Sequence, residues 1–364
     1  MFLLLLPALF FAAAGISSFY YRRKWRRSLS VEVAFEKPAL DVGETGFLRE
    51  TVSNKKLLPF WCGSLRCRVP VFIELAHGAS GGGNFCDAAS AFSYETVSRR
   101  VPFTARRRGY FRMDGAELHT QDFFFQYRLL CAYPAHAELY VYPELRRAQR
   151  YGPELSRLTG EVLARRHYLE DETRFKGIRD YAPSDSLRRV NWYATAKTGE
   201  IKVNEFSCTT AQEVWLLLDF DALTVWDSED LREDILSSAA YLARALLQSG
   251  VPVGLAANVP DAATGAEAGL PCRAGAGQDT ALRRVLARAL PERAVRPFSP
   301  LLTEVLGRTR ASSQYILLSL SAPEELQVET APLRGSRLHW AVFAPKDARL
   351  RISDRRGITL CETP

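Results

Sequence analysis

The hydrophobic pattern changes character partway along this 364-residue chain, and that change limits the folds open to it. Before about residue 145, apolar residues alternate with polar ones in short segments separated by Gly, Pro and Asn. After residue 213, continuous apolar runs alternate with amphipathic stretches. The first pattern is typical of strands in a half-buried sheet, and the second is typical of an α/β domain. The sequence therefore predicts more than one domain, as its length allows.

Short strand candidates fill the first half of the chain. They are SVEVAFEKP, DVGETGFLRETVSN, RCRVPVFIEL, SYETVSRRVPF, DFFFQYRLLC and AELYVYPEL. Because turn residues separate them, we expect an antiparallel β-sandwich over residues 29–150. The Gly-rich segment at residues 76–86 has no lysine and no helical run after it, so we interpret it as a hairpin connection rather than a phosphate-binding loop.

The last part of the chain, residues 213–364, predicts a parallel sheet with helices on both faces. EVWLLLD is a continuous apolar strand that ends at Asp219, and VPVGLAA, QYILLSLS and RLHWAVF are further strands. Helices are expected around residues 281–289 and 300–306, and also where apolar residues recur at helical spacing at Leu231, Ile235, Leu242 and Leu246. Strand and helix in alternation indicate a Rossmann-like α/β domain.

An uncharged run occupies residues 2–21, about the length that a helix needs to cross a bilayer. Basic residues follow it at Arg22, Arg23, Lys24, Arg26 and Arg27. A secretory signal would carry positive charge before the apolar run, so residues 1–28 are predicted to be a transmembrane helix with a basic flank. By the positive-inside rule the bulk of the chain is then cytoplasmic. The alternative is a cleaved signal or a buried core helix.

Composition and charge argue against several classes of protein. The net charge of +7 is modest and comes largely from the cluster after residue 21 and from residues 106–108, whereas a nucleic-acid partner needs a wider basic face. The seven cysteines form no CxxC pair, which argues against a disulfide framework or a zinc site. The histidines share no motif with a nucleophile, so we expect no catalytic residues and no cofactor.

A linker region, residues 151–212, joins the two domains. PELSRLTGEVLARRHYLE has apolar residues near helical spacing and predicts a linker helix. The segment FKGIRDYAPSDSLRRVNWYATAK, residues 175–197, follows it. We interpret it as a structural or interaction motif whose members are Gly177, Arg179, Tyr181, Pro183, Asp185, Arg188, Asn191 and Trp192.

The residue types of this motif suggest that it holds two domains together. Pro183 fixes the backbone, and Ser184 or Asp185 can cap a short helix with Leu187, Val190 and Ala194 on one face. Arginines at 179, 188 and 189 can reach Asp185 or backbone carbonyls, and Trp192 can act as a packing anchor. Because paired guanidinium forks demand a defined geometry, we hypothesise that the motif clasps the two domains together. An ordinary solvated charged face is the alternative.

The same residues resemble the signature of domain-of-unknown-function family fifty-eight (DUF58), a run like G-x-R-x-Y-x-x-G-D-x-x-R-x-[IV]-[ND]-W. RRRGYF, DFFFQY, LYVYP and EVWLLLDFD extend the resemblance over nearly the whole chain. Ser184 stands where the family commonly has Gly, and Lys197 where it commonly has Arg. Many family members carry two membrane segments near the N-terminus, whereas this sequence predicts one. The resemblance implies a membrane-proximal β-rich region, a von Willebrand factor type A-like domain, and association with MoxR-type AAA+ ATPases in chaperone-like assembly or activation of other proteins.

Domains of the von Willebrand type often hold Mg²⁺ through D-x-S-x-S after the first strand. Here Asp219 and Asp221 are followed by Leu223, which supplies no oxygen ligand, so we predict a degenerate, metal-free loop. A makeshift site of Asp219, Asp221 and Thr224 is the alternative.

Asp185, Glu200 and Lys202 have the residue types of a metal-dependent hydrolase or nuclease. Such a site needs these side chains to converge from adjacent strands, whereas residues 187–196 predict a helix. We therefore expect a non-enzymatic membrane-anchored adaptor or scaffold. Its partners would be membrane lipid, a MoxR-type ATPase and an unidentified client protein, with a hydrolase as the alternative.

Overall fold

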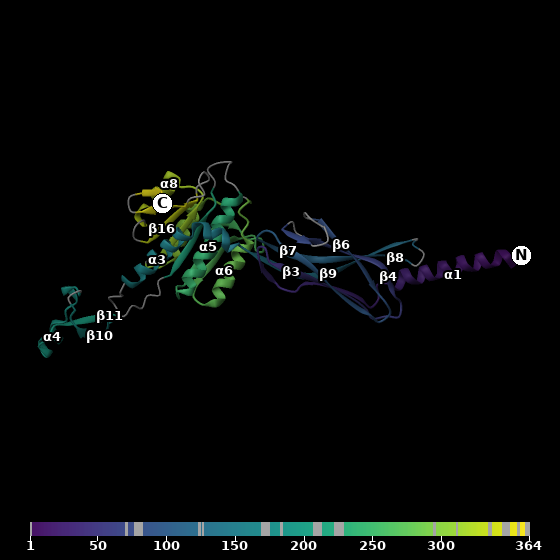
Figure 1. The fold of residues 1–364 in the computed structure, drawn as a ribbon, viewed down its shortest axis with the longest axis horizontal. Helices are drawn as coiled ribbons and strands as arrows, with labels where there is room; N and C mark the ends of the chain where they lie inside the picture. The colour runs from purple at the N-terminus through teal and green to yellow at the C-terminus, as the bar shows by residue number, and fades with distance from the viewer. Residues whose placement is uncertain are drawn as a thin grey trace. The chain divides into compact units, whose positions relative to one another are not determined.

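The computed structural model describes residues 2–69, 72–75, 83–122, 125, 127–168, 175–182, 185–206, 213–221, 229–293, 296–310, 312–333, 337–343, 350–354 and 357–360. Two compact units divide the chain, Met1–Glu144 and Leu145–Pro364. The first is rich in strands, and the second combines helices with a larger sheet (Figure 1). This confirms the predicted order of a β-rich region followed by an α/β region.

Two sheets build the first unit. One has the order β1-β3-β7-β5 and is antiparallel throughout: β1 is Leu29–Phe35, β3 Thr45–Asn54, β7 Thr96–Ala105 and β5 Ile73–Leu75. The other has the order β2-β9-β8-β4-β6: β2 is Ala39–Asp41, β9 Arg128–Tyr142, β8 Gly109–Gln121, β4 Phe60–Val69 and β6 Gly83–Ala91. Only the short pair β2–β9 in this second sheet is parallel.

Alternating side chains from both sheets share one core. Every second residue of β3 is buried, including Leu48 and Val52, and Leu65, Leu118 and Leu139 come from the other sheet. This is the layering expected of a sandwich.

Three predicted strand boundaries in this unit are wrong. DFFFQYRLLC was predicted as one strand, but Asp122 lies in the turn after β8 and β9 begins only at Arg128. RCRVPVFIEL divides between β4 and β5. The segment at residues 76–86 was predicted as a hairpin connection, yet β6 begins within it at Gly83.

The last turns of helix α1, Phe2–Lys24, pack against the core of the first unit. Tyr21 and Trp25 are buried in the sandwich core, and the buried Ser18 Oγ donates a hydrogen bond to the buried Asp122 carboxylate. Lys56 Nζ donates to the Trp25 carbonyl oxygen, and the Arg22 guanidinium lies 4.1 Å from the centroid of the Tyr127 ring. Within the part of the chain that the structure describes, no helix meets the length and hydropathy that a membrane span requires.

A seven-stranded sheet forms the second unit, in the order β14-β13-β12-β15-β16-β17-β18. Its central strands are β13 (Val253–Pro260), β12 (Val214–Asp219), β15 (Gln314–Ser319) and β16 (Leu338–Phe343), and they run parallel. The strands β14 (Glu267–Arg273), β17 (Leu350–Asp354) and β18 (Gly357–Leu360) are antiparallel to their neighbours. The prediction of a wholly parallel sheet is therefore wrong for these three outer strands.

Helices cover both faces of this sheet because the central strands bury both faces. In β12, Leu216 and Leu218 share a core with α5 (Glu229–Gln248) and α6 (Ala276–Arg288). Leu217 points to the opposite face and shares a core with α7 (Phe298–Arg308) and α8 (Glu324–Thr330), which is followed by a 3₁₀ turn, Ala331–Leu333. Burial of both faces explains why the sequence of β12 is an unbroken apolar run, the pattern that predicted a buried strand.

The helix predicted as a linker packs instead into the α/β core. Helix α2 (Leu145–Ala148), the 3₁₀ turn Gln149–Tyr151 and helix α3 (Gly152–Tyr168) precede the motif, and Leu155, Leu158 and Val162 lie in the core with α5. Tyr151 donates its hydroxyl to the buried Asp234 of α5 at 3.0 Å. The structural boundary therefore lies between Glu144 and Leu145.

The end of α1 offers a direct test of how it is held. We expect Ser18→Ala to lower the free energy of unfolding of the first unit by about 1 to 3 kcal/mol, because the buried Asp122 carboxylate loses a donor. Ser17→Ala is the matched control, since the exposed Ser17 hydroxyl only donates to Ala14 O within the helix at 2.9 Å. Thermal unfolding of both variants measures the difference. Equal stability of the two would contradict the proposed role of the Ser18–Asp122 bond.

Candidate functional site

The motif forms a small antiparallel hairpin of its own. Strand β10, Phe175–Asp180, pairs with β11, Lys202–Phe206, and the pairing shifts by one residue near Gly177. Between them lie a 3₁₀ turn, Leu187–Arg189, and helix α4, Trp192–Thr198. Tyr181 extends the hairpin by donating its backbone N–H to Ile201 O at 3.0 Å. Pro183 and Ser184 lie outside the described residues.

An ion pair holds the loop that follows β10. The Arg179 guanidinium donates to both carboxylate oxygens of Asp185, Nη1 to Oδ2 at 2.7 Å and Nη2 to Oδ1 at 2.6 Å. The same carboxylate accepts the Ala182 N–H at 2.8 Å, and Asp185 N–H donates to Ala182 O at 2.8 Å. This two-pronged geometry is the strong, orientation-specific form of an arginine–carboxylate pair.

The structure thus brings together Arg179 and Asp185, two of the residues singled out from the sequence. Arg188 lies in the 3₁₀ turn, where its backbone N–H donates to Ser186 Oγ at 3.4 Å. Contact of this motif with the sandwich stays a prediction.

The helix predicted over residues 187–196 is interrupted. Ser186, rather than Ser184 or Asp185, caps the 3₁₀ turn, and the chain then extends through Val190, which forms a β-bridge with Val203. A new helix, α4, starts only after Asn191, whose Oδ1 accepts the Ala194 N–H at 2.9 Å. A residue that caps the start of a helix has a non-helical backbone, so one helix cannot run through Asn191. The β-branched Val190 favours an extended backbone.

Asn191 connects the helix to the hairpin. Its Nδ2 donates to Asn204 Oδ1 at 2.7 Å, and its backbone N–H donates to Lys202 O at 2.8 Å. Thr195 of α4 donates its hydroxyl to Asn191 O at 2.8 Å and accepts the Lys202 N–H at 3.0 Å. Every functional group of the Asn191 side chain therefore has a structural use.

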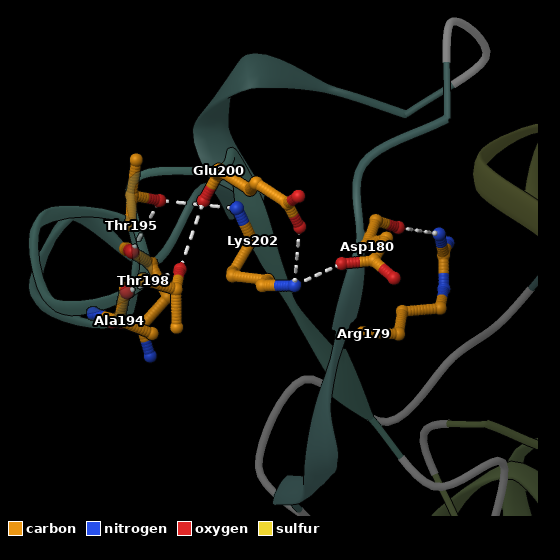
Figure 2. Close-up of polar contacts among 8 residues, drawn as sticks. Arg179, Asp180, Ala194, Thr195, Thr198, Glu200 and Lys202 are labelled. Carbon is orange, nitrogen blue, oxygen red and sulfur yellow. Dashed lines mark hydrogen bonds and ion pairs between the residues drawn. The ribbon is translucent and has the colours of Figure 1, made fainter.

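Lys202 lies between two carboxylates (Figure 2). Its Nζ donates to Asp180 Oδ1 and, at 3.2 Å, to Glu200 Oε2. These two hydrogen bonds, that to Asp180 being the larger influence, raise the pKa of Lys202 above its usual value and keep the amine charged. Asp180 was not singled out from the sequence. Its signal is the strand register, which sets Asp180 opposite Lys202.

The residues of the alternative hydrolase site are divided between these two ion pairs. Asp185 bonds to Arg179, while Glu200 bonds to Lys202. Among the described residues, no group of three or more His, Cys, Asp or Glu side chains is arranged to hold a metal ion. Lys202 therefore bonds to Asp180 and Glu200 rather than to Asp185.

Large hydrophobic side chains lie on the surface of the motif. Trp192 is 70% exposed, Tyr193 80% and Leu187 68%. The sequence predicted Trp192 as a packing anchor, whereas in the structure its indole faces solvent. Exposed aromatic groups are enriched in protein contact surfaces.

A second cluster of acidic residues lies at the carboxyl end of β12. The buried Asp219 accepts the Asp221 N–H through Oδ1 at 2.9 Å. Asn258 donates its amide to Asp221 Oδ1 at 2.9 Å and to Asp219 Oδ1 at 3.3 Å. Asp221 Oδ2 also accepts the Phe298 N–H at 2.8 Å. Both carboxylates are thus held by donors of the protein itself, and sequence analysis missed Asn258, which lies on the next strand. Ala222, Leu223 and Thr224 lie outside the described residues.

Burial is the main influence on the Asp219 carboxyl group. It raises the pKa of Asp219 to about 7, and the nearby Asp221 charge adds to the rise, while the hydrogen bonds from Asp221 N–H and Asn258 oppose it. The folded protein therefore favours the protonated form of Asp219 at mildly acidic pH.

Together these observations define a protein with a β-rich unit, an α/β unit and an ion-paired motif before the first strand of the large sheet. Residues 177–314 match the family described as "Protein of unknown function DUF58". The match begins at Gly177, the first residue of the motif, and it supports the identification of the chain with this family. No curated protein matches the sequence.

Solved structures give only low similarity. The alkylpurine DNA glycosylase AlkC of Pseudomonas fluorescens, bound to DNA containing an abasic site analog, is 13% identical, and the match covers 31% of this chain and 30% of the glycosylase, with a TM-score of 0.20. The CARDB domain of the PF1109 protein of Pyrococcus furiosus, in complex with di-metal ions, is 16% identical over 31% of this chain and 86% of that domain, with a TM-score of 0.21. A type II cohesin domain of Acetivibrio cellulolyticus is 12% identical over 31% and 95%, also with a TM-score of 0.21. Similarities of this size support no conclusion about function.

The Arg179–Asp185 pair should stabilise the motif locally. We expect Asp185→Asn to speed the hydrogen–deuterium exchange of the β10 and β11 amides about fivefold, equivalent to about 1 kcal/mol for a half-exposed charged pair. Asp180→Asn is the matched control, because that carboxylate is 77% exposed and its loss should change exchange little. If Asp180→Asn has the larger effect, the assignment of the main contact to Asp185 is wrong.

The raised pKa of Asp219 predicts a pH dependence of stability. A carboxyl group with a raised folded pKa stabilises the fold fully below its unfolded pKa, and this contribution is lost as pH rises towards about 7. The parent protein should therefore lose up to about 4 kcal/mol more stability than Asp219→Asn between pH 4 and pH 7.5. Denaturant titrations of both proteins across this range measure it. Parallel pH profiles for parent and variant would contradict the prediction.

The donors around Asp219 and Asp221 also bear on Mg²⁺. We expect millimolar Mg²⁺ to leave the melting temperature of the protein unchanged, because Asn258 and backbone N–H groups already bond to both carboxylates. A saturable rise that Asp219→Ala abolishes would show that the cluster binds the ion.

Proposed function

We propose that this chain is a non-enzymatic, membrane-anchored adaptor or scaffold that works with a MoxR-type AAA+ ATPase in the chaperone-like assembly or activation of other proteins. In this proposal α1 anchors the chain as a single-pass transmembrane helix and the bulk of the chain is cytoplasmic.

The observation that carries the proposal is the surface of the motif. Leu187, Trp192 and Tyr193 are exposed on a segment whose backbone is fixed by the Arg179–Asp185 pair and by Asn191. Exposed aromatic side chains on a rigid frame are the usual anchors of protein–protein contacts, because they bury a large area with little loss of conformational freedom. An adaptor needs a surface of this kind.

The topology of the second unit supports a domain of the von Willebrand type. Numbered from β12, its sheet has the order 3-2-1-4-5-6 followed by one more strand, and the third, sixth and seventh strands (β14, β17 and β18) are antiparallel to their neighbours. This is the doubly wound order, in which ligands bind at the carboxyl ends of the strands, where Asp219 lies. The arrangement agrees with the domain that the family resemblance implies.

The proposed membrane anchor rests on the sequence pattern at the start of the chain. The uncharged residues 2–21 lie within a helix whose last turn carries Arg22, Arg23 and Lys24. Positive charge at one end of an apolar helix favours the orientation with that end in the cytoplasm.

Two ion pairs favour the adaptor over the hydrolase. Asp185 is engaged by Arg179, and Lys202 by Asp180 and Glu200. A lysine amine already bonded to two carboxylates is poorly placed to polarise an attacking water, and a carboxylate bonded to arginine is a poor metal ligand.

Affinity capture from solubilised membranes tests the proposal. The tagged parent should retain an AAA+ ATPase, and the double change Trp192→Ser and Tyr193→Ser should reduce the amount retained at least about tenfold, as expected when anchor residues are lost. Val328→Ser is the matched control, because Val328 is 75% exposed on α8, outside the motif. Metal-dependent cleavage of nucleic acid by the parent, lost in both Asp185→Asn and Lys202→Ala, would establish the hydrolase instead.

A further inference from the structure

The exposed hydrophobic side chains of the sandwich gather at one of its ends. Because the strands are antiparallel, the β3–β4, β6–β7 and β8–β9 connections meet at the same end. These connections and the adjoining strand starts carry Leu57, Trp61, Phe92, Tyr94, Phe125 and Tyr127, which we call the rim. Leu130, near the start of β9, is exposed beside it. Apart from α1, these account for all the large hydrophobic side chains that are exposed among the described residues of the first unit.

The rim lies where α1 joins the sandwich. Ser18 reaches Asp122 in the β8–β9 connection, Arg22 stacks on Tyr127 of the rim, and the Trp25 carbonyl accepts a bond from Lys56 in the β3–β4 connection. Figure 1 shows α1 continuing away from this end of the strands. The rim therefore adjoins the base of the helix.

Charge around the rim is strongly positive. Arg22, Arg23, Arg26 and Arg27 are exposed, and Lys55 and Lys56 belong to the β3–β4 connection. Two acidic residues lie in the connections at this end: Asp122 is buried, and Glu95 accepts the Phe92 N–H at 2.7 Å. Aromatic rings with a polar edge and basic side chains on apolar stems are the groups that settle in the headgroup layer of an anionic bilayer.

We propose that the rim is a lipid-docking surface, through which the sandwich rests on the headgroups of an anionic membrane around the base of α1. This inference rests on the membrane anchoring proposed above and adds a second contact, made by the sandwich itself. Trp61 and Phe92 pack edge to face with ring centroids 6.1 Å apart, so that Trp61 is a fixed probe, 47% exposed, on this surface. A protein partner or a second copy of the chain is the competing occupant.

Tryptophan fluorescence of the full chain reconstituted in vesicles tests the proposal. The probe is the signal of the parent minus that of Trp61→Phe, a change that keeps an aromatic ring against Phe92. In vesicles of phosphatidylglycerol and phosphatidylcholine, lipids that carry a nitroxide near the headgroup should quench this difference signal. Iodide in the water should not reach it. Trp192→Phe removes an exposed indole outside the rim and should leave the lipid-quenched component unchanged.

Separate outcomes distinguish this inference from the anchoring on which it rests. A chain that fails to float with vesicles in a density gradient would overturn the anchor. A chain that floats while Trp61 stays open to iodide and is not quenched from the lipid would overturn the docking surface alone. Shielding from iodide without quenching from the lipid would assign the rim to a protein partner. Equal quenching in vesicles of phosphatidylcholine alone would overturn the part played by anionic headgroups.

Discussion

Burial of both faces of the central strand β12 is the constraint on which the second unit depends. Leu216 and Leu218 on one face and Leu217 on the other have no exposed surface, so the sheet requires a layer of helices on each side. The need to cover the face of Leu216 and Leu218 accounts for α2 and α3, which precede the motif in sequence yet belong to the α/β core. The motif is consequently an insertion between two elements of one folded unit, and not a spacer between two independent ones.

The fold could be predicted from sequence where hydrophobic periodicity alone decides it. EVWLLLD became β12 and the spacing of Leu231, Ile235, Leu242 and Leu246 became α5, because burial on one or two faces leaves a direct trace in the pattern. Prediction failed where polar side chains decide the backbone. Asn191 caps a helix and so divides the run from Leu187 to Ala196, and Asp122 closes a turn within an otherwise strand-like segment. The outer strands β14, β17 and β18 run antiparallel to their neighbours, a direction that hydrophobic spacing does not encode.

The candidate site was predictable in its residues but less so in its pairings. Arg179 and Asp185 were expected to pair, and they do so because the β10 turn brings them within hydrogen-bond reach. The partner of Lys202 was missed because Asp180 is 22 residues away in sequence and becomes a neighbour only through strand register. Asn258 was missed for the same reason, since it meets Asp219 and Asp221 only across parallel strands. In both clusters, donor groups of the protein itself form hydrogen bonds to the carboxylates. We therefore interpret each cluster as structural.

The short connection between α1 and β1 has a mechanical consequence. Helix α1 ends at Lys24 and β1 begins at Leu29, and within this interval Trp25 is buried and Ser28 adopts a left-handed backbone with a φ of 53°. Rotation about this junction would pull the Trp25 indole out of the core and break the Ser18–Asp122 hydrogen bond. The direction in which α1 leaves the sandwich is therefore tied to the packing of the sandwich core.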